Sequence, residues 1–111
     1  MNVIMKFGGT SVADADAMTR VINIVRNHIA RHPGHTLPVV VVSAMSKVTD
    51  RLVQTGRLAG EGDGEAATAL LRDLLTRHVG VAASLVHGEA LETLAARLTL
   101  DFTELSAHVS A

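Results

Sequence analysis

The sequence predicts an α/β fold with parallel strands and helices on both faces, and three stretches of its 111 residues carry this prediction. Residues 3–7 form a short apolar run that ends in glycines, which is typical of a buried strand. Residues 14–31 carry apolar side chains at intervals of three and four, the spacing of one buried helix face. Residues 39–42 are four valines in a row, the pattern of a parallel strand that is buried on both faces. Strand, helix and strand in this order predict a right-handed βαβ unit.

The pattern in the middle of the chain predicts two helices with a glycine-rich connection between them. We expect a helix at about residues 49–58 whose inward side chains are Leu52 and Val53, and a second at about residues 65–86. Residues 60–64 contain three glycines and predict a flexible connection.

The last part of the chain carries one apolar stripe. Residues 87–88 break the preceding helix, and the stripe then steps by three and four almost to the last residue. Its members are Leu91, Leu94, Leu98, Phe102, Leu105 and Val109. The stripe either packs on the sheet within the chain or forms a seam with a partner, and packing within the chain is the preferred interpretation.

Composition excludes several classes of function. Hydrophobic residues make up 48% of the chain and aromatic residues only 2%, so we expect a folded domain with an aliphatic core. Ten basic and eleven acidic residues leave no basic stripe for nucleic acid. The absence of cysteine excludes thiolate metal sites and fits a reducing compartment. Because no signal-peptide layout or long apolar run is present, we expect a cytoplasmic protein without a membrane partner.

Three histidines near the end of the first predicted helix could suggest a metal site. His28 and His32 are four residues apart, and His35 follows closely. This spacing can bind a metal ion, but polar side chains on a solvated helix end explain it as well. We therefore expect no metal site.

The first candidate site follows the first strand. Lys6 precedes Gly8 and Gly9, and the hydroxyls of Thr10 and Ser11 come just before the helix. Glycines let a ligand approach the backbone, and a lysine beside the free N–H groups of a helix start favours an anion. The pattern therefore predicts a phosphate site, although a strand end, a turn and a capped helix would explain the spacing equally well. Neither the P-loop spacing nor the dinucleotide-binding fingerprint is present.

A second loop of small and hydroxyl residues follows the second strand, at residues 43–49. Parallel strands deliver their carboxyl ends to the same edge of a sheet, which is where α/β proteins place ligands. The two loops should therefore face each other across this edge.

Both loops resemble motifs of the aspartate kinases. Lys6-Phe7-Gly8-Gly9-Thr10-Ser11-Val12 is similar to the N-terminal signature of that family. Ser43-Ala44-Met45, followed by Lys47-Val48-Thr49-Asp50, is similar to its second motif at about the expected separation. Other amino-acid kinases share the fold and the Lys-Gly-Gly pattern. The resemblance implies that residues 1–111 are the incomplete N-terminal portion of an amino-acid kinase domain, part of a three-layer αβα sandwich.

The resemblance implies a role for each matched position. Lys6 would be the catalytic residue that neutralises charge on the phosphoryl group transferred from ATP. The ATP phosphates would be bound by Lys6, Gly8, Gly9, Thr10 and Ser11. The substrate would be bound by Ser43, Ala44, Met45 and Thr49.

The resemblance also implies a reaction, in which ATP with Mg²⁺ phosphorylates the β-carboxylate of L-aspartate to give 4-phospho-L-aspartate. This is the first step toward lysine, threonine and methionine. Because later motifs of the family are missing, we expect the isolated chain to be inactive. A sheet of two strands leaves unpaired edges, so we also expect a homo-oligomer. The alternatives are another amino-acid kinase of the same fold, or a catalytically inert interaction module.

Overall fold

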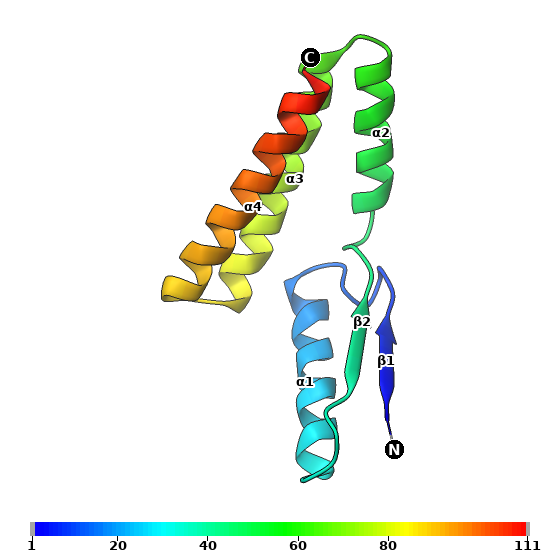
Figure 1. Cartoon of the computed structure of the whole chain (residues 1–111), viewed down its shortest axis with the longest axis vertical. Helices are drawn as coiled ribbons and strands as arrows, with labels where there is room; N and C mark the ends of the chain where they lie inside the picture. Colours follow the sequence, from blue (N-terminus) through cyan, green and yellow to red (C-terminus); the bar gives the residue numbers. More distant parts are fainter. Residues whose placement is uncertain (1, 111) are drawn as a thin grey trace. The chain divides into compact units, whose positions relative to one another are not determined.

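The structure is a computed structural model that describes residues 2–110 (Figure 1). The elements in chain order are β1 (Ile4–Phe7), α1 (Ala15–Arg31), β2 (Val39–Val42), α2 (Val48–Gly60), α3 (Gly64–Leu85) and α4 (Gly88–Val109). The chain divides into two compact units, one ending at Lys47 and the other beginning at Val48. Every element that the sequence predicts is present.

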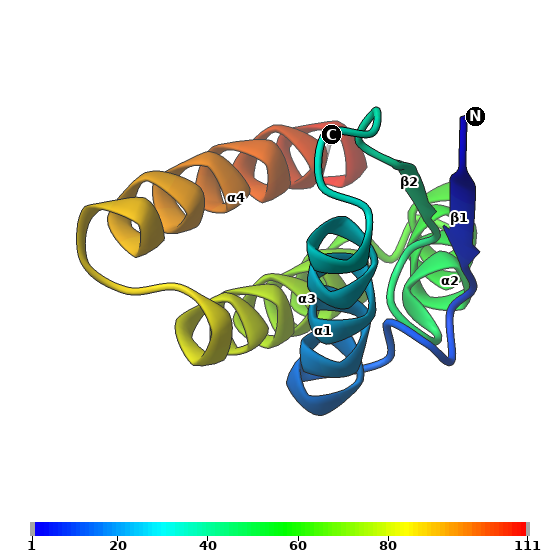
Figure 2. The same ribbon diagram turned by 90° about the horizontal axis from the view of Figure 1, so that it is seen from below.

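The first unit is a parallel βαβ unit. β1 pairs with β2 in a register that runs from Ile4 opposite Val39 to Phe7 opposite Val42. The pairing continues past both ends of the strands, because the Val39 amide donates to the Val3 carbonyl over 2.9 Å and the Ser43 amide donates to the Phe7 carbonyl over 3.1 Å. α1 connects the two strands and lies alongside them (Figures 1 and 2). The predicted parallel pairing is confirmed.

The first helix begins where the sequence predicts. Asp14 is its N-cap, and a carboxylate oxygen of Asp14 accepts a hydrogen bond from the Ala17 amide over 2.8 Å. An aspartate in this position satisfies a backbone donor that the first turn of the helix leaves without a partner. The helix ends at Arg31, just before the Pro33-Gly34 turn.

The predicted burial of β2 on both faces is wrong. The four valines Val39–Val42 have exposed fractions between 40% and 56%, and Ile4 on β1 is 71% exposed. Within its own unit the described sheet has two strands and one helix. A strand of a parallel sheet is buried only where neighbouring strands and helices cover its edge and both faces. The three-layer arrangement with helices on both faces therefore stays a prediction.

The second unit is helical, and α3 is its central element. α2 and α4 both pack against α3. The buried residues of α3 are Ala67, Leu71, Leu74 and Ala82. Ala67, Leu71 and Leu74 follow one another at intervals of four and three, so one stripe of α3 forms the core of this unit.

The predicted inward positions of α2 are wrong. Leu52 and Val53 are 40% and 56% exposed, whereas Val48 and Thr55 are buried. The two buried residues are seven positions apart and so lie on one stripe of the helix, from which Val53 is turned away. The hydroxyl of Thr55 donates to the Arg51 carbonyl over 2.8 Å, which allows this polar residue to be buried.

The connection between α2 and α3 is a hydrogen-bonded turn. The Gly62 amide donates to the Ala59 carbonyl, and the Asp63 amide donates to the Leu58 carbonyl over 2.9 Å. These two bonds form a Schellman motif, and Gly62 has the left-handed φ of 83° that the motif requires. Asp63 then caps α3 through its carboxylate, which accepts from the Ala66 amide over 3.1 Å.

α4 packs within its own unit, against α3. The predicted packing of its apolar stripe on the sheet stays a prediction, and two members of the stripe, Leu94 and Leu105, are 40% and 41% exposed. Half-buried positions such as Leu91, Leu98 and Phe102 belong to the stripe, and α4 itself has no fully buried residue.

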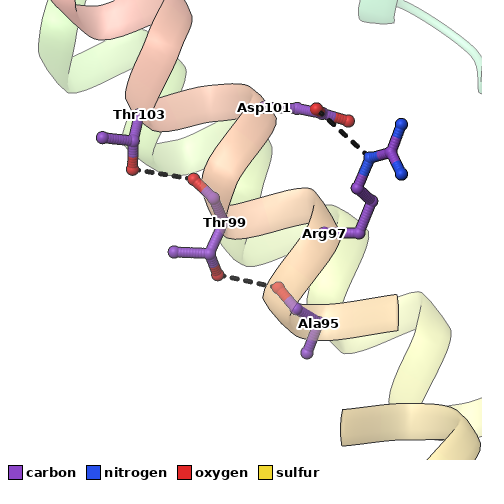
Figure 3. A network of polar contacts seen from close by, with 5 residues as sticks. All are labelled: Ala95, Arg97, Thr99, Asp101 and Thr103. Atoms are coloured by element: carbon purple, nitrogen blue, oxygen red, sulfur yellow. Dashed lines mark hydrogen bonds and ion pairs between the residues drawn. The ribbon is translucent and has the colours of Figure 1, made fainter. Parts of the chain in front are cut away.

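Figure 3 shows polar contacts along the same helix, where the hydroxyls of Thr99 and Thr103 each donate to the carbonyl four residues earlier. No helix among residues 2–110 is long and apolar enough to cross a membrane.

Candidate functional site

The two predicted loops meet at the carboxyl edge of the sheet. The Ser43 amide donates to the Phe7 carbonyl over 3.1 Å, so the chain leaves both strands at the same level. A Cβ atom added at Gly9 would lie 3.6 Å from the Ala44 carbonyl oxygen, 3.7 Å from Ser43 Oγ and 3.8 Å from the Cα of Ser46. The backbone at Gly9 therefore lies directly against the second loop, and the predicted facing of the two loops is confirmed.

The first loop is held in place by a turn and by one buried side chain. The Ser11 amide donates to the Gly8 carbonyl over 3.0 Å, which closes a tight turn through Gly9 and Thr10. Val12 follows and is only 3% exposed. Because Val12 anchors the end of the loop, the exposed residues before it are kept next to the sheet edge.

The second loop has a similar anchor. Met45 is 6% exposed, so its side chain belongs to the core and only its backbone can contribute to a site. Ser43 and Ala44 are exposed, and the Ser43 hydroxyl donates to the Ala44 carbonyl over 2.9 Å. Lys47 has a left-handed φ of 68°. A residue other than glycine in this conformation costs on the order of 1–3 kcal/mol, and such strain is often found at functional sites.

Eight of the nine predicted site residues lie in the first unit, at or beside this edge. Lys6 is exposed at the third position of β1, and Gly9 is half-buried between the loops. The ninth residue, Thr49, is exposed in the first turn of α2 and belongs to the second unit.

The start of α1 is less favourable to an anion than the sequence predicts. The carboxylate of Asp14 already accepts from the Ala17 amide, and Asp16 adds a second negative charge in the first turn. Both charges offset the positive end of the helix dipole. A phosphate at this edge must therefore rely on the Lys6 ammonium and on the loop amides.

Two residues that the sequence reasoning did not select also belong to this edge. Ser46 lies beside Gly9, and Lys47 adds a second positive charge in a strained conformation. The signal for Ser46 was its hydroxyl within a run of small residues between strand and helix. The positive φ of Lys47 has no signal in the sequence, because Lys rarely adopts this conformation.

The three histidines at the end of α1 interact mainly with one another. The rings of His28 and His32 stack with centroids 4.4 Å apart, and His35 meets His32 edge-on at 5.7 Å. Nδ1 of His32 is 2.8 Å from the His28 carbonyl oxygen. Among residues 2–110 no group of three or more His, Cys, Asp or Glu side chains is arranged to hold a metal ion.

Comparison with known proteins adds independent information. The model of the amino acid kinase family matches residues 1–107. A bifunctional aspartokinase/homoserine dehydrogenase 1 of Zea mays is 33% identical over 108 residues, which are 97% of this chain and 11% of that protein. The corresponding protein of Arabidopsis thaliana has the same identity and coverage. An aspartokinase of Rickettsia conorii is 45% identical over 51 residues, 46% of this chain and 12% of that protein.

The matched segments therefore cover about a tenth of the length of these relatives. The matches confirm the resemblance to aspartate kinases that the two motifs predict.

Proposed function

The chain belongs to the amino acid kinase family, and we propose that its sheet edge is the phosphoryl-binding wall of an aspartokinase site. The observation that supports this most directly is the meeting of the two motif loops, with Gly9 against residues 43–46. On this proposal residues 1–111 are the N-terminal portion of a kinase domain.

The proposed reaction transfers the γ-phosphoryl group of ATP to L-aspartate. A β-carboxylate oxygen of aspartate attacks the γ-phosphorus, the bond from phosphorus to the β,γ-bridging oxygen breaks, and ADP leaves. The products are 4-phospho-L-aspartate and ADP. A carboxylate is already ionised at neutral pH, so the site needs no general base. Phosphoryl transfer depends mainly on positioning the two reactants and on neutralising charge.

Lys6 has the central role in this proposal. It is exposed at the carboxyl end of β1 and next to the glycine loop, so its ammonium can offset charge on the transferred group. Gly8 and Gly9 offer their amides without a side chain that would keep a phosphate away, and a Cβ atom added at Gly8 would meet nothing within 4 Å. Thr10 and Ser11 add exposed hydroxyls that can donate to phosphate or carboxylate oxygens.

The second loop would line the meeting point of ATP and aspartate. Ser43 offers a hydroxyl, whereas Ala44 and Met45 offer backbone groups, which agrees with the burial of the Met45 side chain. Thr49 would contact the amino-acid substrate. We assign this contact from the family resemblance alone.

Mg²⁺ fits the site as a companion of the nucleotide. Residues 2–110 contain no arranged group of three or more metal-ligating side chains, and Mg²⁺ in kinase sites is bound largely by substrate phosphates and water. When bound, the ion would offset part of the negative charge of the phosphates. Lys6 and the loop amides would bind the oxygens that remain.

Titration of the chain with ATP and Mg²⁺ by isothermal calorimetry tests the phosphoryl wall. We expect weak saturable binding in the unaltered chain and none in Lys6→Ala. Arg20→Gln removes the same charge from the exposed side of α1 and serves as the matched control. Equal loss in both variants would indicate attraction by net charge alone. An absence of binding in the unaltered chain would instead favour an inert interaction module.

We also propose that the isolated chain has no appreciable kinase activity. Only one wall of the site lies in these residues, and the curated relatives are far longer. A coupled assay for aspartyl phosphate tests this directly. Activity that is present in the purified chain and lost in Lys6→Ala would contradict the proposal.

The open sheet suggests self-association as the state of the chain in solution. Exposed valines along β2 and the unpaired outer edges of the two described strands favour pairing with a second copy. Light scattering over a range of concentrations should show a homo-oligomer. A monomer at the highest concentration would contradict this.

The biosynthetic and cellular setting follows from the same proposal. Aspartyl phosphate would supply lysine, threonine and methionine synthesis. The absence of cysteine fits the cytoplasm, whereas the plant relatives carry the description chloroplastic.

A further inference from the structure

A small cavity lies at the amino end of the sheet, and the proposed phosphoryl transfer does not use it. Its lining residues are Val3, His28, His32, His35 and Thr36, and its volume is about 160 Å³. Val3 precedes β1 and Thr36 precedes β2, so the cavity lies at the end of the sheet opposite the two motif loops. The volume leaves room for an ion with a few water molecules, because one water occupies roughly 30 Å³ in the liquid.

The hydrogen bond of His32 fixes which of its ring nitrogens is free. Nδ1 of His32 is 2.8 Å from the His28 carbonyl oxygen. A carbonyl can only accept, so Nδ1 carries the hydrogen and donates it, and the lone pair of the neutral ring is on Nε2. Histidines that bind a metal commonly donate their other ring N–H to a backbone carbonyl in this way. His32 is therefore in the tautomer that presents Nε2 to a metal ion.

His28 offers a second imidazole beside that nitrogen. The two histidines are four positions apart and share one face of α1. Their rings are inclined by only 28°, with centroids 4.4 Å apart. Two nitrogens bound to one Zn²⁺ ion are at most about 4.2 Å apart, a separation that rings stacked this closely can reach by small rotations. The His28 ring makes no hydrogen bond or ion pair with another residue among 2–110.

The end of α1 favours a positive charge at this place. His28 lies in the last turn of the helix and His32 is its C-cap. The last carbonyls of a helix carry partial negative charge, which attracts cations. No carboxylate among residues 2–110 forms an ion pair with the histidines of the cavity. Arg31 in the same turn is a competing positive charge, but it is exposed to water and salt, which screen it.

We propose that His28 and His32 bind a divalent transition-metal ion that prefers imidazole nitrogen, such as Zn²⁺. Imidazole suits Zn²⁺, Cu²⁺ and Ni²⁺, whereas Mg²⁺ and Ca²⁺ prefer oxygen ligands. Among residues 2–110 no group of three or more metal-ligating side chains is arranged around one point, so water supplies the remaining ligands and the ion exchanges readily. The spacing alone favours no metal ion over a solvated helix end; the tautomer of His32 and the cavity favour the ion. This site is separate from the proposed phosphoryl wall, and its test does not depend on kinase activity.

Calorimetric titration of the full chain with zinc chloride, without nucleotide, tests the site. We expect saturable binding of one Zn²⁺ per chain and no binding of Mg²⁺ at the same concentration. NMR of the imidazole nitrogens should show shifts at His28 and His32 on addition of Zn²⁺, while those of His78, His87 and His108 stay in place. Titration without saturation, or equal shifts at all six histidines of the chain, would overturn the proposal.

Single variants identify the ligands. His28→Gln and His32→Gln should each weaken Zn²⁺ binding at least about tenfold, because loss of a ligand costs no less than loss of a residue that orients it. His108→Gln is the matched control, since His108 is an exposed histidine in the last turn of α4, and it should leave the affinity unchanged. Zn²⁺ should also raise the Tm of the unaltered chain and leave that of His32→Gln in place. If Zn²⁺ binds both folded variants as tightly as the unaltered chain, the proposed site is wrong.

Discussion

The two units of this chain differ in two respects. One is how many of their backbone N–H and C=O groups are hydrogen-bonded within the unit, and the other is how far their apolar side chains are buried. The βαβ unit pairs two strands and leaves all four β2 valines at least 40% exposed. Its buried side chains, which include Val12, Ala17 and Met45, belong to loops and to the start of α1. The helical unit has a core of its own along α3, where Leu71 is 1% exposed.

The difference has a physical origin in the two kinds of secondary structure. A helix closes its hydrogen bonds within one segment, so three helices around one apolar stripe can form a unit with few unsatisfied groups. A strand needs neighbours on both edges and cover on both faces. The buried side chains of the two loops, Val12 and Met45, therefore hold the motif residues at the carboxyl edge of the sheet. The faces of the sheet stay exposed.

The largest expected effect comes from truncating the helical core. Leu71→Ala should lower the free energy of unfolding by about 2–5 kcal/mol, because it removes a buried side chain and leaves a cavity. Val40→Ala on β2 should cost less than about 1 kcal/mol, since Val40 is already 40% exposed. Urea unfolding followed by circular dichroism measures both.

Leu100→Ala is the matched control for this pair, because Leu100 on α4 is 54% exposed and should tolerate truncation within about 0.5 kcal/mol. A cost for Val40→Ala equal to that of Leu71→Ala would break the comparison. Unfolding is measured at a concentration at which the chain is monomeric, because the proposed association of the sheet would itself cover Val40.

The next effect concerns the turn between α2 and α3. Gly62→Ala should destabilise the helical unit by about 1–2 kcal/mol, because an L-residue is strained at a φ of 83°. Gly80→Ala in α3 should instead stabilise by about 1 kcal/mol, since a Cβ there meets nothing within 4 Å and alanine favours helix. Thermal unfolding of the two variants gives opposite shifts of Tm. Shifts of the same sign would show that the left-handed φ of Gly62 does not determine the change in Tm caused by its substitution.

A smaller effect compares the helix caps of the two units. Asp14→Ala and Asp63→Ala should each cost about 1 kcal/mol, because each carboxylate accepts from an amide in the first turn. Amide hydrogen exchange should show the loss in α1 for the first variant and in α3 for the second. Substitution by Asn keeps a capping oxygen and should restore most of the stability. Exchange that rises throughout the chain in both variants would indicate that the units unfold together.

The smallest effect is expected at the ion pair on α4 shown in Figure 3. Arg97 Nε and Asp101 Oδ1 are 3.7 Å apart, and the two side chains are 76% and 56% exposed. Because water and salt screen such a pair, Arg97→Ala should change the free energy of unfolding by less than about 0.5 kcal/mol. A double-mutant cycle with Asp101→Ala measures the coupling. A coupling above 1 kcal/mol would show that this surface is less exposed in solution.

Local patterns predicted most of the elements and the meeting of the two loops. The spacing of Met18, Val21 and Val25 predicted α1, and the parallel strand order predicted that the loop at residues 8–11 faces the loop at residues 43–49. The contact of Gly9 with residues 43–46 came from the structure. The burial of β2 and of Leu52 was predicted wrongly. Periodicity tells which residues share a face, but it does not tell whether another element covers that face.

Sequence by itself determined the helix and strand positions and the two family motifs, because each depends on residues close together in the chain. It left Asp14 and Asp16 as alternative caps of α1, and the structure selects Asp14. Only the tertiary structure decided which stripe of α2 is buried, the left-handed Lys47, and the cavity lined by Val3 and His28. These features depend on contacts between distant segments and on backbone strain that those contacts maintain. Neither is encoded in the period of a single helix or strand.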